Sequence, residues 1–474
     1  MIEKYYDGAI EQVAAGLGTV EKNYLLVRYS GQFSVENLND TKQLEKNEDI
    51  FVQVHEFETG EITCAYEPYL TMICDGFRRY MTGTFEEFME TCDVYYLHRP
   101  VLLSYFNQDN TGREEIILLD EVAYEQERML AALERMLCAI ADRHPVLFVL
   151  NRFQLASKST MQLTARFLKC ENCNIGLVLG VSDIQAMPEF LVPDWEMLYE
   201  TLDDGSKIYH IGNSGRKKEE TIDDEKYVDY GSEKVYRKLQ NMVEFLDFDQ
   251  AAYYLETIER KIKFDNLLVD DAARFRMWLL FVKVSILRQD IPKALEICED
   301  LEKIHLAGKE EECAYEQDYL IATAYMYQGK LKEALEMAGE TYRIAGKMSD
   351  DYRMFLSELL EAKIQMSGWY NIFFCAQDVK IKESLIQNLI RYNYRNHLAH
   401  VYIYAYDNKP EIVKKANQSE ELLIYFSRGI RIAKKLGNEY LINMAYQKNI
   451  MLSSTNGMYE LSLIHISEPT RPIS

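Results

Sequence analysis

The side chains best placed to do chemistry follow a short apolar stretch in the first third of the chain. Residues 146–150 read Val-Leu-Phe-Val-Leu, and Asn151 and Arg152 come directly after them. Five consecutive apolar residues, mostly branched or aromatic, predict a parallel strand that is covered on both faces. At the end of such a strand, nucleotide hydrolysis needs a carboxylate to hold the magnesium shell and to position the attacking water. Here an amide and a guanidinium stand in its place, and the arginine would repel the metal.

Two arrangements of cysteine and histidine have the spacing of metal ligands. Cys170 and Cys173 form one CxxC, but no second pair and no histidine follow at a zinc-finger spacing. His397 and His400 form an HxxH without the glutamate of a zincin motif, so helix packing is the favoured reading. The cysteines are scattered and predict buried free thiols; they are residues 64, 74, 92, 138, 170, 173, 298, 313 and 375. We therefore assign no catalytic, cofactor-binding or metal-binding residue, and no cofactor.

The elements around the strand predict a βαβ arrangement. Residues 123–142 have apolar residues at helical spacing, residues 159–168 predict a second helix, and residues 175–181 predict a second buried strand. Such units imply a right-handed crossover in a parallel sheet. Further expected elements are a helix at 1–17, strands at 24–29, 50–57 and 206–211, and more helix at 85–106. Residues 114–119 fit either a strand or the start of a helix.

This arrangement resembles the Walker B region of STAND-type signalling ATPases, the AAA-related modules of MalT-like bacterial regulators. In that family a helix leads into an apolar strand that ends in two acidic residues, and the next strand ends near an arginine sensor. Asn151 and Arg152 replace the acids here, and Ser182 and Asp183 end the next strand. The segment Ala65-Tyr66-Glu67-Pro68-Tyr69 is similar to the Pro-Tyr segment that opens a helix in these proteins. The resemblance implies an α/β, P-loop-NTPase-like sheet that has lost its chemistry.

The phosphate-binding loop of that family is also missing from its expected place. It would follow the strand at 24–29 as G-x-x-x-x-G-K-[S/T], but residues 30–40 contain one glycine, no lysine and two acids. The Gly-Lys pairs at 308–309, 329–330 and 346–347 are not followed by Ser or Thr. Two independent losses predict a pseudo-ATPase.

Composition limits the partners. The formal net charge of −23 and a pI near 4.9 make binding to DNA, RNA or anionic membranes unfavourable. No stretch approaches the roughly 20 apolar residues that span a bilayer, and the amino terminus lacks the features of a signal peptide. We expect a cytoplasmic protein that contacts neither nucleic acid through this segment nor a membrane.

The second half of the chain contains a repeated pattern that resembles the longer tetratricopeptide repeats attached to STAND modules. Copies start at residues 246, 289, 329, 368 and 408, in steps of 43, 40, 39 and 40, and a cut-off copy starts at Gly457. The small residues Ala294 and Ala334 would let the two helices of a pair approach closely. Gly, Gln or Asn at the turn tolerates a left-handed conformation. Stacked pairs predict a superhelix with a concave groove for a protein or peptide partner.

Four segments follow from these patterns. Residues 1–215 are the expected degenerate STAND/AAA ATPase-like α/β domain, 216–232 a charged linker, and 233–460 the helical repeats. Residues 461–474 include a stretch that resembles a translated sequencing adapter, so they are set aside and the repeats are expected to be truncated. The fold class is α/β, then an all-α solenoid.

The favoured function is the non-catalytic regulatory and scaffold portion of a bacterial signalling protein. By the family analogy, the repeats would control a missing C-terminal output domain, either a GGDEF diguanylate cyclase or a helix-turn-helix regulator. One alternative is an active, divergent ATP-dependent switch, which would need a displaced lysine (Lys42 or Lys46) and a displaced acid (Asp120 or Glu121). The other alternative is a stand-alone repeat adaptor without an output domain.

Overall fold

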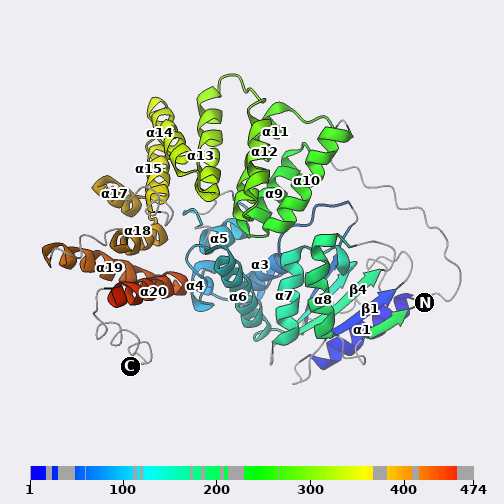
Figure 1. Cartoon of the computed structure of the whole chain (residues 1–474). Coiled ribbons are helices and arrows are strands. Elements are labelled where there is room, and N and C mark those ends of the chain that lie inside the picture. The colour runs from blue at the N-terminus through cyan, green and yellow to red at the C-terminus, as the bar shows by residue number, and fades with distance from the viewer. Residues whose placement is uncertain are drawn as a thin grey trace. The chain divides into compact units, whose positions relative to one another are not determined.

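The structure is a computed structural model of the whole chain (Figure 1). It describes residues 2–17, 24–29, 49–58, 60–109, 115–117, 121–170, 174–182, 187–202, 208–211, 229–265, 267–366, 382–407 and 416–455. The predicted phosphate-binding loop, most of the predicted linker, the repeat copies at 368 and 408, and residues 461–474 lie outside these ranges.

The chain divides into two compact units, each built from several stretches of sequence. The first contains residues 1–94, 98–112 and 125–277; the second contains 95–97, 113–124 and 278–474. The predicted division at 216–232 stays a prediction, because residues 216–228 of it are not among those described.

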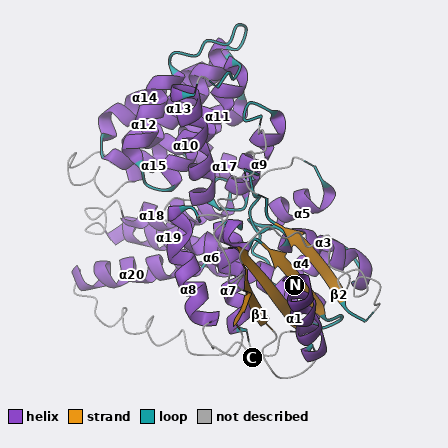
Figure 2. Ribbon diagram, turned by 90° about the vertical axis from the view of Figure 1, so that its right-hand side faces the viewer, coloured by secondary structure: helices purple, strands orange, loops and turns teal. Residues whose placement is uncertain are grey.

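The first unit is built on a parallel sheet with the strand order β2-β3-β4-β1-β5. Figure 2 shows these strands side by side in orange. Their bounds are β1 Tyr24–Tyr29, β2 Phe51–Glu56, β3 Val146–Asn151, β4 Ile175–Ser182 and β5 Ile208–Ile211. Every residue of β3 and β4 is buried, which confirms the prediction of strands covered on both faces.

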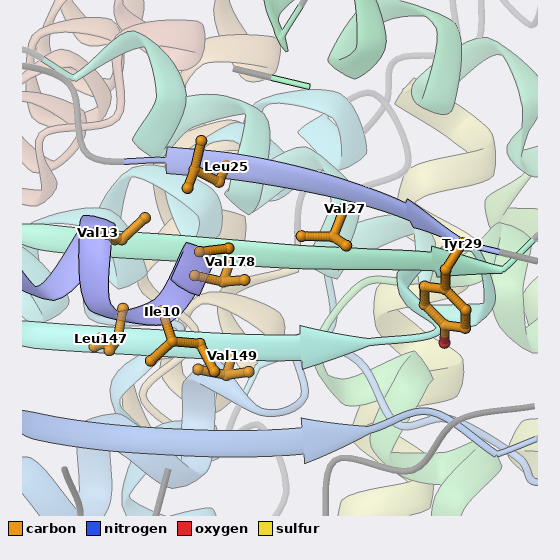
Figure 3. Close-up of a cluster of buried hydrophobic side chains, with 9 residues drawn as sticks. Ile10, Val13, Leu25, Val27, Tyr29, Leu147, Val149 and Val178 are labelled. Carbon is orange, nitrogen blue, oxygen red and sulfur yellow. The ribbon is translucent and has the colours of Figure 1, made fainter. Parts of the chain in front are cut away.

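One face of the sheet packs on α1 (Ile2–Gly16). Ile10 and Val13 of this helix lie against side chains of β1, β3 and β4, among them Val27, Leu147 and Val178 (Figure 3). Gly176 of β4 is needed for this contact, because a Cβ atom there would lie 2.7 Å from a methyl group of Val13. The helix therefore sits directly on the sheet.

The other face packs on helices through alternate side chains of the same strands. The ring of Phe148 in β3 lies 4.7 Å from that of Tyr69 in α3 (Tyr69–Tyr80), whose ring is 5.4 Å from that of Phe167 in α7 (Lys158–Lys169). Tyr69 is fully buried, and its hydroxyl forms a 2.6 Å hydrogen bond with Thr164 of α7. These contacts hold α3 and α7 together against this face of the sheet.

The predicted elements of this unit are confirmed, with two differences. Residues 85–106 form two helices rather than one, α4 (Phe85–Thr91) and α5 (Arg99–Asn107), because Asp93 adopts a left-handed conformation (φ 51°) that ends α4. A helix after Pro188 was not predicted: α8 (Val192–Leu202) packs on α7. The helix before β3 is α6 (Val122–Ala141), and residues 115–117 are irregular.

Antiparallel helix pairs follow the sheet. The first unit includes α9 (Glu233–Glu244) and α10 (Phe248–Phe264), and its boundary with the second unit falls within α11 (Asp271–Leu287). The second unit continues with α12 Ile291–Leu301, α13 Glu310–Gln328, α14 Leu331–Lys347, α15 Asp351–Met366, α17 Glu383–Arg391, α18 Arg395–Asp407, α19 Ala416–Leu436 and α20 Glu439–Thr455. The fold class is therefore α/β followed by all-α, as predicted.

Six turns between described helices share one geometry. At Gly329 the amide donates to Met326 O (3.2 Å) and the next amide, Lys330 N, donates to Tyr325 O (2.9 Å), which is the Schellman pattern. The same pattern, with the first residue left-handed, occurs at Leu246, Gln289, Gly329, Ser349, Asn393 and Gly437. The predicted turns near 246, 289 and 329 are among them. Ala294 and Ala334, predicted to allow close helix approach, are fully buried.

None of the helices in the described part of the chain has the length and apolar composition that crossing a bilayer requires.

Candidate functional site

The carboxyl edge of the parallel sheet is the place where α/β proteins of this kind bind ligands. The strand register places Tyr29 of β1 beside Ser182 of β4, and Glu56 of β2 beside Asn151 of β3. The residues that the sequence singled out at the ends of β3 and β4 therefore share one edge with Tyr29 and Glu56. Neither of these last two was predicted, because nothing in the local sequence marks a strand-end tyrosine or glutamate as a neighbour of Asn151.

Asn151 forms a side-chain hydrogen bond with another residue of the first unit. Its side chain is fully buried, and its Oδ1 accepts a 2.6 Å hydrogen bond from the hydroxyl of Tyr29, which is 1% exposed. Burial raises the pKa of Tyr29 to about 12, although Arg152 and the hydrogen bond to Asn151 partly oppose this rise. The tyrosine is therefore a neutral hydrogen-bond donor at pH 7. This pair fills the end of β3 with an uncharged contact.

Arg152 follows in a left-handed conformation (φ 53°), which is costly for a residue with a Cβ atom. Its Nε lies 3.4 Å from Oε1 of Glu56, and both side chains are largely buried. The carboxylate of Glu56, at the end of β2, thus faces the guanidinium of Arg152. Gln154 exchanges two hydrogen bonds with the backbone of Ser182, at 3.1 and 3.3 Å, and closes the edge between β3 and β4.

The amino terminus of α7, just after this edge, could in principle bind an anion through its free amides. These amides already have acceptors within the first unit. Ser159 N donates to Asp247 Oδ2 (3.0 Å), Lys158 N to Gln250 Oε1 (3.3 Å) and Thr160 N to Ser157 Oγ (3.2 Å). The Lys158 ammonium forms an ion pair with Asp249. Asp247 before α10 and Gln250 of α10 therefore already fill this helix terminus.

The divergent active site stays a prediction, because Lys42, Lys46 and Asp120 lie outside the described residues, as does Asp183 at the end of β4. Glu121 belongs to the second unit, where its Oε2 accepts a 3.0 Å hydrogen bond from Asn438. Among the described residues, no cluster of three or more His, Cys, Asp or Glu side chains could hold a metal ion.

The described cysteines are free thiols in the structure. Burial raises the pKa of Cys64, Cys74 and Cys298 to about 12, so these thiols stay protonated at pH 7. Cys173 lies outside the described residues, which leaves the CxxC untested as a pair.

A cleft of about 600 Å³ opens in the first unit between α3, α5 and α9. Its size is in the range of small-molecule sites. Its lining residues are Thr71, Cys74, Asp75, Arg78, Val101, Ser104, Tyr105, Gln108, Asp109, Arg237, Gln240, Asn241, Glu244 and Phe245. Arg78 is held by Phe106 O (2.8 Å) and by Asp75 (3.2 Å). Because arginines and acids alternate around the cleft, its charge selects no one class of ligand.

A buried polar cluster in the second unit surrounds the predicted HxxH. His397 is 1% exposed at the start of α18, and its Nδ1 lies 2.6 Å from Oε1 of Glu115. The same carboxylate accepts hydrogen bonds from the backbone amides of His397 (2.7 Å) and Asn396 (3.2 Å) and from the hydroxyl of Tyr96 (2.7 Å). His397 therefore packs among helices, as the sequence predicted. Its partner there is the carboxyl group of Glu115, which the sequence did not reveal.

The Tyr29–Asn151 contact predicts a measurable loss of stability. Replacing Tyr29 by phenylalanine leaves the buried Oδ1 of Asn151 without its donor, and we expect the free energy of unfolding to fall by about 1–3 kcal/mol. The double variant Tyr29→Phe, Asn151→Leu removes both polar partners and is expected to recover part of that loss. Urea unfolding of the two variants tests this. Equal stability of the single variant and the wild type would contradict it.

No protein-family model matches this chain, and a search of curated proteins found no match either. The function must therefore be inferred from the side chains at the sheet edge and in the helix pairs.

Proposed function

We propose that the chain is the non-catalytic regulatory and scaffold portion of a cytoplasmic bacterial signal-transduction protein. Its sheet unit would keep the skeleton of a nucleotide-binding module without hydrolysing nucleotide. The observation that carries this proposal is the sheet edge, where the Tyr29–Asn151 hydrogen bond and the Arg152–Glu56 pair stand in place of two metal-binding acids. A magnesium–nucleotide complex would meet the guanidinium of Arg152 there.

The helix pairs would bind a protein or peptide partner. Stacked pairs joined by short turns typically present an extended surface for such partners. The net charge of −23 supports a protein partner over nucleic acid, because a polyphosphate backbone would be repelled. By the family resemblance, the array would control an output domain of the GGDEF or helix-turn-helix class.

Isothermal titration of the full chain with Mg-ATP tests the first part of this proposal. We expect no heat of binding at concentrations up to about 1 mM, a weak-affinity limit that corresponds to roughly 4 kcal/mol of binding free energy. A phosphate-release assay on the same sample is expected to match the buffer blank. Micromolar binding would contradict the proposal and favour the divergent switch. The Arg152→Ala variant serves as the matched control, since binding that it leaves unchanged would lie away from the sheet edge.

A further inference from the structure

The cleft between α3, α5 and α9 has a buried floor and an exposed polar rim. Cys74, Val101 and Phe245 line it with side chains that are almost fully buried. The rim consists of exposed polar side chains, which are Arg78, Gln108, Asp109, Arg237 and Gln240. A cavity of about 600 Å³ that combines an apolar floor with a few polar groups is the usual form of a small-molecule site. The cleft therefore has the size and the lining that a ligand needs.

Most polar groups around the cleft already have partners within the first unit. The pairs are Arg78 with Asp75 (3.2 Å), Tyr105 with Thr71 (3.2 Å), Ser104 with the carbonyl oxygen of Asp109 (2.8 Å), and Arg237 with Glu233 (3.3 Å). Each arginine thus faces a carboxylate of the protein. Because these charges are balanced in this way, the ligand must be selected by another group.

The side chain of Asn241 in α9 is that group. Asn241 lines the cleft, but its side-chain amide forms no hydrogen bond with any described residue, and its Oδ1 is shielded from solvent. Buried polar atoms of native proteins nearly always have a hydrogen-bond partner, and one without a partner lowers stability. A ligand that bonds to this amide removes that cost. The amide carries a donor and an acceptor side by side, and it turns readily about its last bond.

We infer that the cleft binds a small, neutral, flat molecule with an amide edge, in which an N–H group and a carbonyl oxygen are adjacent. Such an edge pairs with the amide of Asn241 through two hydrogen bonds, as asparagine side chains pair with the edge of a base. The aromatic side chains of Tyr105 and Phe245, whose ring centroids are 5.8 Å apart, also line the cleft and give a flat ring an apolar surface. The inference goes beyond the proposed function, which assigns no ligand to the first unit.

Isothermal titration of the full chain with 2-quinolone and with N-methyl-2-quinolone at pH 7 tests this. The two compounds share their rings and carbonyl group, but in the second a methyl group replaces the N–H donor. We expect 2-quinolone to bind with a Kd of about 1 mM or lower, as a compound of its size can. The methylated compound is expected to bind at least about fivefold more weakly. Equal affinities, or no binding of 2-quinolone, would overturn the inference.

The Asn241→Leu chain shows whether the binding takes place in the cleft. We expect it to bind 2-quinolone at least about fivefold more weakly than the wild type does, and to bind the methylated compound no more weakly. Lys234→Ala is the matched control, because Lys234 is exposed on the same helix and does not line the cleft. Both affinities should be unchanged in the control. A loss in Asn241→Leu no greater than that in Lys234→Ala would also overturn the inference.

Urea unfolding checks that the Asn241→Leu chain is folded. Leucine removes an amide that has no partner among the described residues, so we expect the variant to be no less stable than the wild type. If the variant does not fold, the comparison of the two compounds on the wild-type chain still decides the inference. Its failure would leave the proposed function intact, because that proposal depends on the sheet edge and is tested with Mg-ATP.

Discussion

Replacing Asp247 by alanine is expected to lower the free energy of unfolding of the first unit by about 2–4 kcal/mol. Asp247 is 4% exposed, and its carboxylate accepts hydrogen bonds from two helix ends, Ser159 N of α7 (3.0 Å) and Gln250 N of α10 (3.4 Å). The alanine variant loses one helix cap and leaves a buried amide of α7 without an acceptor. The effect is large because one side chain serves two helices.

The chain contains a matched control for this prediction. Asp290 occupies the same position in the next turn and caps α12 through Lys293 N (3.2 Å), but it is exposed and serves no second helix. Asp290→Ala is therefore expected to cost only about 1 kcal/mol. Urea unfolding of both variants, followed by circular dichroism, gives the comparison. A loss for Asp247→Ala no greater than that for Asp290→Ala would show that the contact with α7 contributes nothing.

The contribution of Glu115 to the stability of the second unit is expected to fall as the pH rises from 5 to 8. Burial raises the pKa of Glu115 to about 7 from an ordinary value of 4.5, and the hydrogen bonds from His397, Tyr96 and Asn396 only partly oppose this. The folded state therefore binds this proton more tightly than the unfolded state does. Its stabilising contribution is complete below about pH 4.5 and is lost as the pH rises through 7, a change of about 3 kcal/mol.

The Glu115→Gln variant isolates this effect. Glutamine does not titrate, so the difference in stability between wild type and variant should fall by about 3 kcal/mol over that range. Burial lowers the pKa of His397, so the proton uptake of this histidine on unfolding opposes folding as the pH drops below about 6.5. That contribution is present in both proteins and largely cancels in the difference. Native-state hydrogen exchange of the α18 amides, corrected for intrinsic rates, measures the difference in stability between the two proteins at each pH. A difference that does not change with pH would contradict the assignment.

These two carboxylates have the same structural role. Asp247 accepts a hydrogen bond from an amide at the start of α7. Glu115 accepts one from an amide at the start of α18. In both cases a helix amino terminus, which could hold an external anion, is bound by a side chain of the same protein.

The sequence by itself determined the secondary elements and showed an amide and a guanidinium, not acids, after the third strand. Fully apolar stretches predicted β3 and β4, and helical spacing predicted α1, α6 and α7, because burial on known faces leaves a periodic pattern. The turns near 246, 289 and 329 were also predicted, since Schellman turns depend on a few adjacent residues. Asn151 and Arg152 could be placed at a strand end for the same reason.

Only the tertiary structure decided which polar side chains meet. Tyr29 and Asn151 lie 122 residues apart in sequence, Asp247 and Ser159 lie 88 apart, and Glu115 and His397 lie 282 apart. Such pairs have no periodicity, because each depends on how strands and helices are placed rather than on neighbouring residues. The burial of Tyr394 before α18, and the carboxyl group of Glu115 beside the first amides of that helix, likewise arise only when the chain is folded.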